Sequence, residues 1–272
     1  MRSSIRLYLI LTTILAGSAA TASAQFQPRT LNDPATGERY HIEGSGSIWA
    51  PSATMGISSE SLGIAGSTID FKRDLGLKDQ KFNDLQLVLR PGVKHKLRLQ
   101  YLAIKYAQEA TLVRDLVFNG QLYRIGLPVN SSLSWKTTRL AYEYDFITKN
   151  RGFGGLILEA KYTDVQASLQ SPILFESARA RGPIPALGGI VRVYPVANIS
   201  ITGEVSGITV PEDVSPDYNA HYADFDIYGT VNVTNNVGAK IGYRSIDVGY
   251  TVEQDKGSFV VKGLYFGIVA RY

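Results

Sequence analysis

Residues 199–207 read Ile-Ser-Ile-Thr-Gly-Glu-Val-Ser-Gly, and this stretch decides the fold class. The odd-numbered positions are apolar or glycine, whereas the even-numbered positions carry serine, threonine and glutamate. Successive side chains of a β-strand point to opposite faces, so a strand separates the two sets, whereas an α-helix would scatter them around its circumference. The segment therefore predicts a β-strand with one apolar and one polar face.

The same alternation recurs along the chain in nine further segments. They lie near 40–49, 84–90, 96–103, 139–146, 156–163, 187–194, 223–233, 237–244 and 264–272. Short turns are predicted at Pro91-Gly92, Thr148–Gly152, Pro195–Asn198 and Thr234–Asn236. Longer polar stretches fall at about 51–82, 108–130, 165–183, 211–219 and 252–257. Short turns that alternate with long loops are typical of an outer-membrane barrel, whose long loops are extracellular.

We therefore predict an all-β fold: an antiparallel up-and-down transmembrane β-barrel. Four turns and five loops connect ten strands and leave both termini in the periplasm; eight or twelve strands are the alternatives. Within loop 108–130, Asn119-Gly120 lies between two short apolar runs and predicts a hairpin with a type I′ turn. We expect this hairpin to extend two barrel strands beyond the membrane.

The N-terminus has the layout of a secretory signal. Arg2 and Arg6 precede an apolar run over residues 7–15, and Ala22-Ser23-Ala24 forms a cleavage signature. The apolar run is much shorter than the roughly 20 residues of a membrane-spanning helix. We predict a cleaved Sec signal peptide at 1–24, a periplasmic segment at 25–38 and the barrel at 39–272.

Composition excludes several function classes. Removal of Arg2 and Arg6 with the signal leaves 26 basic against 24 acidic residues, a net charge of +2, too balanced for a nucleic-acid-binding protein. The chain has no cysteine, so disulfides cannot hold an exported form together. Its carboxylates lack the spacing of a calcium loop. We expect no cofactor, no metal and no nucleic-acid partner.

The polar faces carry charges of both signs in mid-strand. A membrane barrel turns these faces to its lumen, where opposite charges can pair. Pairing about the turn at Thr234–Asn236 places Asp226 opposite Arg244 and Thr230 opposite Lys240. We predict a lumen charge network of Glu43, Arg98, Arg139, Glu143, Glu159, Lys161, Arg192, Glu204, Asp224, Asp226, Lys240 and Arg244.

The last nine residues read Leu-Tyr-Phe-Gly-Ile-Val-Ala-Arg-Tyr, with one apolar face made of Leu264, Phe266, Ile268, Ala270 and Tyr272. This strand resembles the β-signal that bacterial outer-membrane proteins present to the barrel-assembly machinery. Residues 66–71, together with 74–77, resemble uncharacterised small outer-membrane barrel proteins. The resemblance implies the fold, the outer-membrane location, and assembly with periplasmic chaperones and the barrel-assembly machinery. It implies no activity.

Candidate chemistry is sparse. His41 and His95 begin strands at the predicted periplasmic end, where we expect polar lining or anchoring roles. His221 lies at the predicted outer rim near Asp213, Asp217 and Asp224, and a His–Asp pair there could activate water. The sequence has no lipase elbow, P-loop or zinc-protease motif, so we expect no catalytic residues.

We expect a non-enzymatic, monomeric barrel with a lumen filled by polar side chains. Its predicted partners are outer-membrane lipid and lipopolysaccharide, and its loops are the predicted interaction surface; the sequence identifies no ligand. Three alternatives stay open: a narrow channel for solutes or ions, a rim enzyme centred on His221, and a soluble lipocalin-like barrel.

Overall fold

A computed structural model describes residues 35–58, 67–210, 218–252 and 255–272. The predicted signal peptide at 1–24 and most of the predicted periplasmic segment lie outside these residues. Within the described part of the chain, no helix is long and apolar enough to span a membrane.

All regular elements are strands. Their bounds are β1 Ile42–Ser58, β2 Ile69–Asp70, β3 Phe82–Gly92, β4 His95–Thr111, β5 Leu116–Phe118, β6 Gln121–Tyr123, β7 Pro128–Lys149, β8 Gly152–Gln170, β9 Phe175–Val196, β10 Ile199–Val210, β11 Tyr218–Asn232, β12 Val237–Val252 and β13 Asp255–Arg271.

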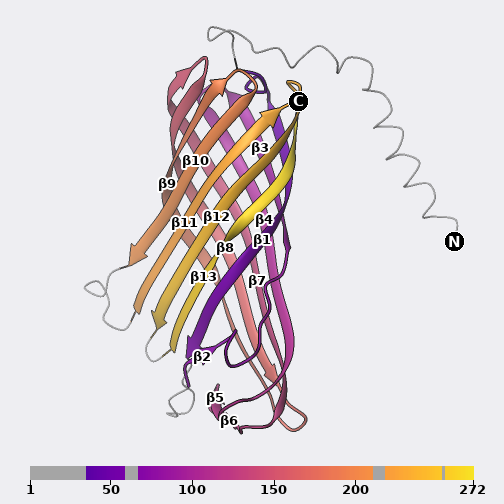
Figure 1. Cartoon of the computed structure of the whole chain (residues 1–272). Helices are drawn as coiled ribbons and strands as arrows, with labels where there is room; N and C mark the ends of the chain where they lie inside the picture. Colours follow the sequence, from indigo (N-terminus) through magenta and orange to yellow (C-terminus); the bar gives the residue numbers. More distant parts are fainter. Residues whose placement is uncertain (1–34, 59–66, 211–217, 253–254) are drawn as a thin grey trace, which may run out of the picture.

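Ten of these strands form a closed antiparallel barrel, which confirms the predicted up-and-down fold (Figure 1). Each strand pairs with the next in sequence, and β13 closes the ring by pairing with β1 from Glu43↔Arg271 to Ser58↔Lys256. Residue 35 and the C-terminus lie at the same end, which we call the terminal end; the opposite end is the loop end. The hairpin β11–β12 has the predicted register, Asp226↔Arg244 and Thr230↔Lys240.

A belt of apolar side chains surrounds the outside of the barrel nearer the terminal end. Every barrel strand contributes at least one residue whose exposed fraction lies between 40% and 70%: Ile48, Leu85, Leu97, Leu140, Leu156, Leu187, Val205, Phe225, Ile241 and Leu264. At the level of this belt, charged residues of the same strands, such as Arg98, Glu143 and Glu204, point inward and are buried. This arrangement is the reverse of a soluble ligand-binding barrel and suits a wall that faces lipid.

Several strands are longer than a membrane requires. β7 and β9 each have 22 residues, whereas a tilted strand spans the bilayer in about 9–11. The loop predicted at 165–183 is therefore mostly wrong, because β8 continues to Gln170 and β9 begins at Phe175. Polar outward residues in this stretch gave the pattern of a loop, although they belong to strands that face water beyond the belt.

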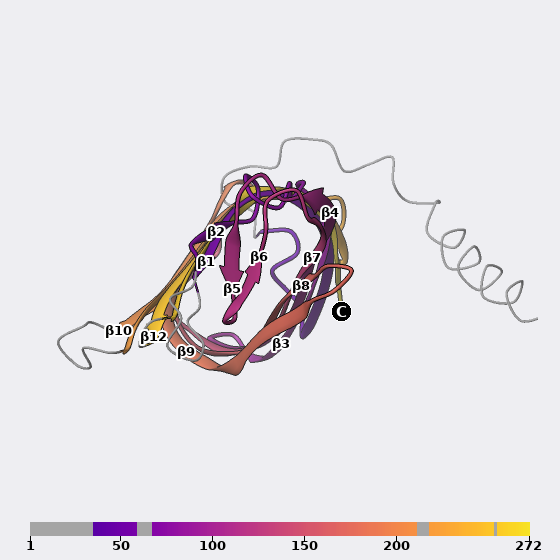
Figure 2. The ribbon, with the colours of Figure 1, turned by 90° about the horizontal axis from the view of Figure 1, so that it is seen from below.

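The loop end is closed by a folded cap. Asn119 and Gly120 have φ values of 50° and 77°, which confirms the predicted hairpin turn. The hairpin does not extend the barrel strands as we expected: β5 and β6 form a separate sheet that lies across the barrel mouth (Figure 2). Buried apolar residues of the hairpin, of segment 67–82 and of the inner wall form one core.

Candidate functional site

The lumen on the terminal side contains a continuous chain of ion pairs. Ten contacts of at most 3.0 Å link eleven residues of alternating charge in the order Asp145, Lys96, Glu143, Arg98, Glu204, Arg139, Glu159, Lys161, Asp224, Arg244 and Asp84. They come from seven strands. Every member except Asp145 and Asp84 at the two ends lies between two opposite charges.

The ion pairs cross the lumen and do not only follow its wall. Glu204 on β10 accepts hydrogen bonds from Arg98 on β4 and Arg139 on β7, both at 2.6 Å. The sheet neighbours of β10 are β9 and β11, so these bonds connect distant parts of the ring. Arg244 on β12 likewise reaches Asp84 on β3 at 3.0 Å. Buried ions need several partners to offset their loss of hydration, and this arrangement supplies them.

The twelve residues predicted for the lumen network all lie on the inner face. Eight belong to the continuous chain. Two form separate pairs: Glu43 with Arg271 at 2.5 Å and Arg192 with Glu38 at 2.9 Å. Sequence reasoning missed Asp84, Lys96, Asp145, Glu38 and Arg271. Asp84, Lys96 and Asp145 lie at alternating positions on the polar faces of their strands. That position was the sequence signal that could have placed them in the lumen network.

Asp226 and Lys240 are the two predicted residues without a salt bridge among the described residues. Asp226 accepts a hydrogen bond from the Tyr265 hydroxyl at 2.8 Å, and Lys240 donates to Ser45 at 3.0 Å. The expected direct pair between Asp226 and Arg244 is wrong although the register is right. The long Arg244 side chain passes its cross-strand partner and binds Asp224 and Asp84 instead.

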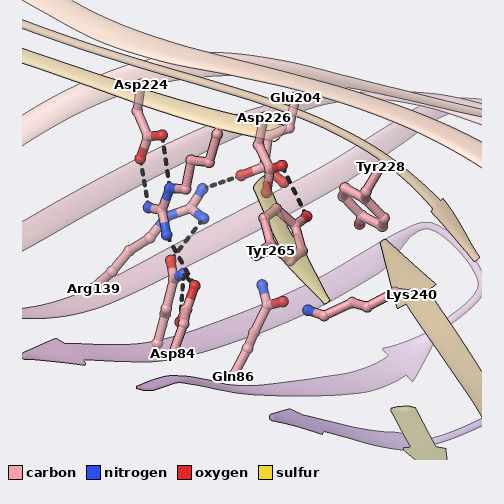
Figure 3. A pocket seen from close by; sticks show the side chains of 11 residues that line it. Asp84, Gln86, Arg139, Glu204, Asp224, Asp226, Tyr228, Lys240 and Tyr265 are labelled. Carbon is pink, nitrogen blue, oxygen red and sulfur yellow. Dashed lines mark hydrogen bonds and ion pairs between the residues drawn. The ribbon is translucent and has the colours of Figure 1, made fainter. Parts of the chain in front are cut away.

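These side chains leave almost no free space. Figure 3 shows acids, amides and tyrosines converging from several strands on one point of the lumen. The cavity between them has about 10 Å³, room for about one water molecule. The lumen is therefore filled at this level.

Residues 35–40 close the terminal end. The Ala35 and Thr36 amides donate to carbonyls of two separate turns, Asn150 at 3.1 Å and Ala197 at 2.7 Å. Gly37 has φ +84°, a backbone conformation that residues with a side chain rarely adopt, so this position favours glycine. The Glu38 carboxylate accepts hydrogen bonds from Arg192 and Tyr194 inside the mouth.

The lumen on the loop side is apolar, which corrects the prediction of a polar lumen throughout. Ile104, Tyr106, Leu133 and Trp135 point inward from β4 and β7 and join the cap in one core. The sequence carried a signal for this change. On β4 the apolar residues occupy odd positions up to Tyr101 and even positions from residue 102 to 106, so the apolar face switches sides in mid-strand.

A buried carboxylate anchors the cap. Asp74 is 2% exposed and accepts hydrogen bonds from Arg114 at 2.6 and 3.1 Å. The same guanidinium donates to the Thr68 carbonyl at 2.6 Å, so it joins segment 67–82 to the link between β4 and β5. The bonds from Arg114 hold the pKa of Asp74 well below its usual range, although burial opposes this.

Two polar bonds hold the β5–β6 hairpin against the barrel wall. Tyr123 donates to the Leu169 carbonyl on β8 at 3.1 Å, and Asn119 donates to Glu176 on β9 at 2.8 Å. Burial raises the pKa of Tyr123 to about 12, so its hydroxyl stays a donor at neutral pH.

His221 does not form the predicted pair with Asp224. The two lie on opposite faces of β11: Asp224 is buried in the ion chain, whereas His221 faces outward. Its Nε2 lies 3.2 Å from Asp247, and both side chains are nearly half exposed. The other predicted neighbours, Asp213 and Asp217, lie outside the described residues.

The predicted assembly strand faces outward. Leu264, Phe266, Ile268, Ala270 and Tyr272 are all exposed on β13 or directly after it. The backbone of Tyr272 donates to the Ile42 carbonyl at 2.8 Å and accepts from the amides of His41 and Ile42. The last residue thus helps close the ring while its side chain stays in the lipid-facing register.

Comparisons with known proteins support the fold. No family model matches the chain, and no curated protein matches its sequence. The outer-membrane protease OmpT of Escherichia coli is similar in structure, with a TM-score of 0.56, 9% identity, and coverage of 85% of this chain and 96% of OmpT.

Two other solved structures match more loosely. The attachment invasion locus protein Ail of Yersinia pestis has a TM-score of 0.37 and 11% identity, with 85% of this chain and 99% of Ail covered. The toluene transporter TodX of Pseudomonas putida has a TM-score of 0.37 and 7% identity, with 89% of this chain and 92% of TodX covered. The likeness to OmpT carries the fold and no activity. The chain has the fold of a small bacterial outer-membrane β-barrel protein.

Proposed function

We propose that this protein is a non-conducting, non-enzymatic barrel of the bacterial outer membrane whose loop end is its interaction surface. The observation that carries the proposal is the filled lumen. The ion chain, the apolar core and the segment 35–40 lie in series along the barrel axis. A solute that passed through would have to displace all three.

Barrel size supports the same conclusion. Barrels of about eight strands are just wide enough for side chains to fill them, and wide aqueous channels need many more. In this ten-stranded barrel, arginine side chains reach carboxylates across the lumen: Arg98 binds Glu204 and Arg244 binds Asp84. A closed interior leaves the outer surface and the cap as the places where a partner can bind.

The absence of catalysis is part of the proposal. Each carboxylate of the ion chain contacts at least one cation at 3.0 Å or less, which disfavours an acid–base pair in the lumen. The His221–Asp247 pair is open to water on the outer wall, where such pairs are mostly solvated surface. We further propose a monomer that is exported through the Sec pathway and assembled with periplasmic chaperones and the barrel-assembly machinery.

Planar-bilayer conductance of the refolded protein tests the proposal. The unaltered barrel is expected to give no steady current. Because the three barriers act in series, Arg98→Ser/Arg139→Ser/Glu204→Ser alone should stay closed. A linker in place of residues 113–125 alone and a deletion of residues 35–40 alone should also stay closed, and only the three changes combined should leak. Heat-modifiable gel mobility of each sample shows that the barrel has formed. A steady open conductance of the unaltered protein would overturn the proposal in favour of a narrow channel.

A further inference from the structure

A row of charged side chains lies on the outer wall directly beyond the apolar belt. On the consecutive strands β4, β7, β8 and β9, the first outward charged residues on the loop side are Lys105, Lys136, Asp164 and Arg181. Lys136 is the cross-strand partner of Asp164, and Asp164 is the partner of Arg181. Neighbouring strands are about 4.8 Å apart, so these residues and Arg179 form one continuous patch, the basic row.

Aromatic residues fix the level of this row in the membrane. Tyr101 on β4 and Tyr162 on β8 are 44% and 53% exposed and lie two to four residues nearer the terminal end. Exposed tyrosines on a membrane protein mark the height of the lipid headgroups. Leucines such as Leu140 and Leu158 follow on the membrane side. The basic row therefore lies at the headgroup level of the outer leaflet.

The row has a large unneutralised positive charge. Asp164 is occupied by Arg179, whose Nε and Nη2 bind its two oxygens at 2.8 and 2.5 Å. Lys105, Lys136 and Arg181 are exposed, and within the described residues none of them has a hydrogen bond or ion pair. Asp164 is the one anion among Lys105, Lys136, Arg179 and Arg181, so the row keeps a net charge of +3. Its cations repel one another, and a bound anion would relieve this repulsion.

The outward cations of the loop side are concentrated in one sector of the barrel, and outside that sector β13 carries Lys262 and Lys256. β10 and β11 contain no lysine or arginine, and the two cations of β12 point into the lumen. The outward residues of these strands beyond the belt include Thr209, His221 and Asp247. A general solubilising surface would spread its cations evenly around the barrel, whereas four of them gather between β4 and β9.

We infer that the basic row binds the phosphate groups of lipopolysaccharide, an inference that rests on the proposed outer-membrane location. Arginine and lysine are the side chains that bind phosphate, arginine through paired donors. A lipid fits better than free phosphate because the row adjoins the belt. The phosphates can contact Lys136 and Arg181 while the acyl chains cover Tyr162 and Leu158. Free phosphate would gain only an exposed, salt-screened attraction.

The test measures binding of purified short-core lipopolysaccharide to the refolded protein in nanodiscs of zwitterionic lipid. The row variant is Lys105→Gln/Lys136→Gln/Arg181→Gln. The control, Lys78→Gln/Lys81→Gln/Lys256→Gln, removes the same charge from exposed positions outside the row. A loss of about fivefold per cation at a charged membrane surface predicts roughly a hundredfold weaker binding for the row variant. The control should bind as the unaltered protein does.

Two further arms separate the causes. Dephosphorylated lipopolysaccharide should bind the unaltered protein and the row variant equally, and inorganic phosphate should not displace the lipid at equal concentration. Heat-modifiable mobility is recorded on the same samples. A protein that forms no barrel would overturn the proposed function. If the barrel folds but affinity for lipopolysaccharide falls equally in the row variant and the control, or falls in neither, the basic row is not the binding site. The proposed function would still stand in that case.

Discussion

The two halves of the barrel are filled in opposite ways, although the same strands build both. On β4 the inward residues Lys96 and Arg98 are buried in the ion chain, and a few residues further Ile104 and Tyr106 are buried in the apolar core. The outside changes in the opposite sense, from Leu99 in the belt to Lys105 beyond it. Each half thus places its apolar residues according to the medium outside.

This comparison shows which interactions can hold each half. Where the wall faces lipid, the apolar residues are outside, and the lumen must be filled by polar groups that satisfy one another. Where the wall faces water, the hydrophobic effect drives apolar residues inward, as in a soluble protein. The terminal half therefore depends on electrostatic pairing and the loop half on packing, and substitutions can test the two separately.

Removal of one ion from the terminal half should have the largest effect. Glu204→Ala leaves Arg98 and Arg139 buried without their shared acceptor, and such a loss costs about 3–5 kcal/mol. Urea unfolding of the refolded barrel, followed by heat-modifiable mobility, measures it. Glu204→Gln keeps the shape and one acceptor and should cost less. A loss below about 1 kcal/mol for the alanine variant would show that the ion chain does not hold this half.

A cavity in the loop half should cost somewhat less and act locally. Leu116 on β5 is fully buried, so Leu116→Ala should destabilise the cap by about 3 kcal/mol. Hydrogen exchange should become faster in β5, β6 and segment 67–82 while the terminal half keeps its protection. Leu122→Ala on the same hairpin is the matched control, because Leu122 is exposed, and it should change stability by less than about 0.5 kcal/mol. Faster exchange throughout the barrel would contradict the separation of the halves.

The fold could be predicted because alternation extends along the whole chain. Each of the ten predicted segments overlaps a barrel strand, since lipid on one side and a polar lumen on the other force a strict period of two. The register of β11–β12 followed from its short turn. The ends of β7, β8 and β9 could not be predicted from the sequence. Beyond the belt the outward residues of these strands are polar, and their pattern resembles that of a loop.

The candidate site could be predicted only in part. Alternation identifies which side chains point inward, and all twelve predicted residues do so. It cannot identify partners across the lumen, such as Arg98 with Glu204, because these strands are far apart in sequence and in the ring. It also missed the cap. On β4 the apolar residues move from odd to even positions, but apolar and polar residues still alternate, so the period of two does not reveal the change.

Protonation of Asp74 should loosen the contact that joins segment 67–82 to the link between β4 and β5. The pKa of Asp74 is lowered in the folded state, so its contribution is present above the unfolded value of about 3.9 and is lost as the pH falls through the folded value. Asp74→Asn should destabilise the cap at neutral pH by about 1–3 kcal/mol. Proteolysis of segment 67–82 at pH 7 and pH 3 measures it. The unaltered protein should be more sensitive at pH 3, and the variant equally sensitive at both; a variant that keeps the pH difference would show that another group is responsible.

The smallest effect on stability is expected at the last residue of the terminal half. The Tyr272 side chain is 84% exposed, and its bonds to the first barrel strand use only the backbone. Tyr272→Ala should therefore change unfolding of the refolded barrel by no more than about 1 kcal/mol, whereas deletion of the residue also removes the bonds to Ile42 and should cost more. If the final strand acts as an assembly signal, the alanine variant should insert poorly in cells although it refolds normally in detergent. Normal insertion of both variants would leave Tyr272 a role in closing the ring and none in assembly.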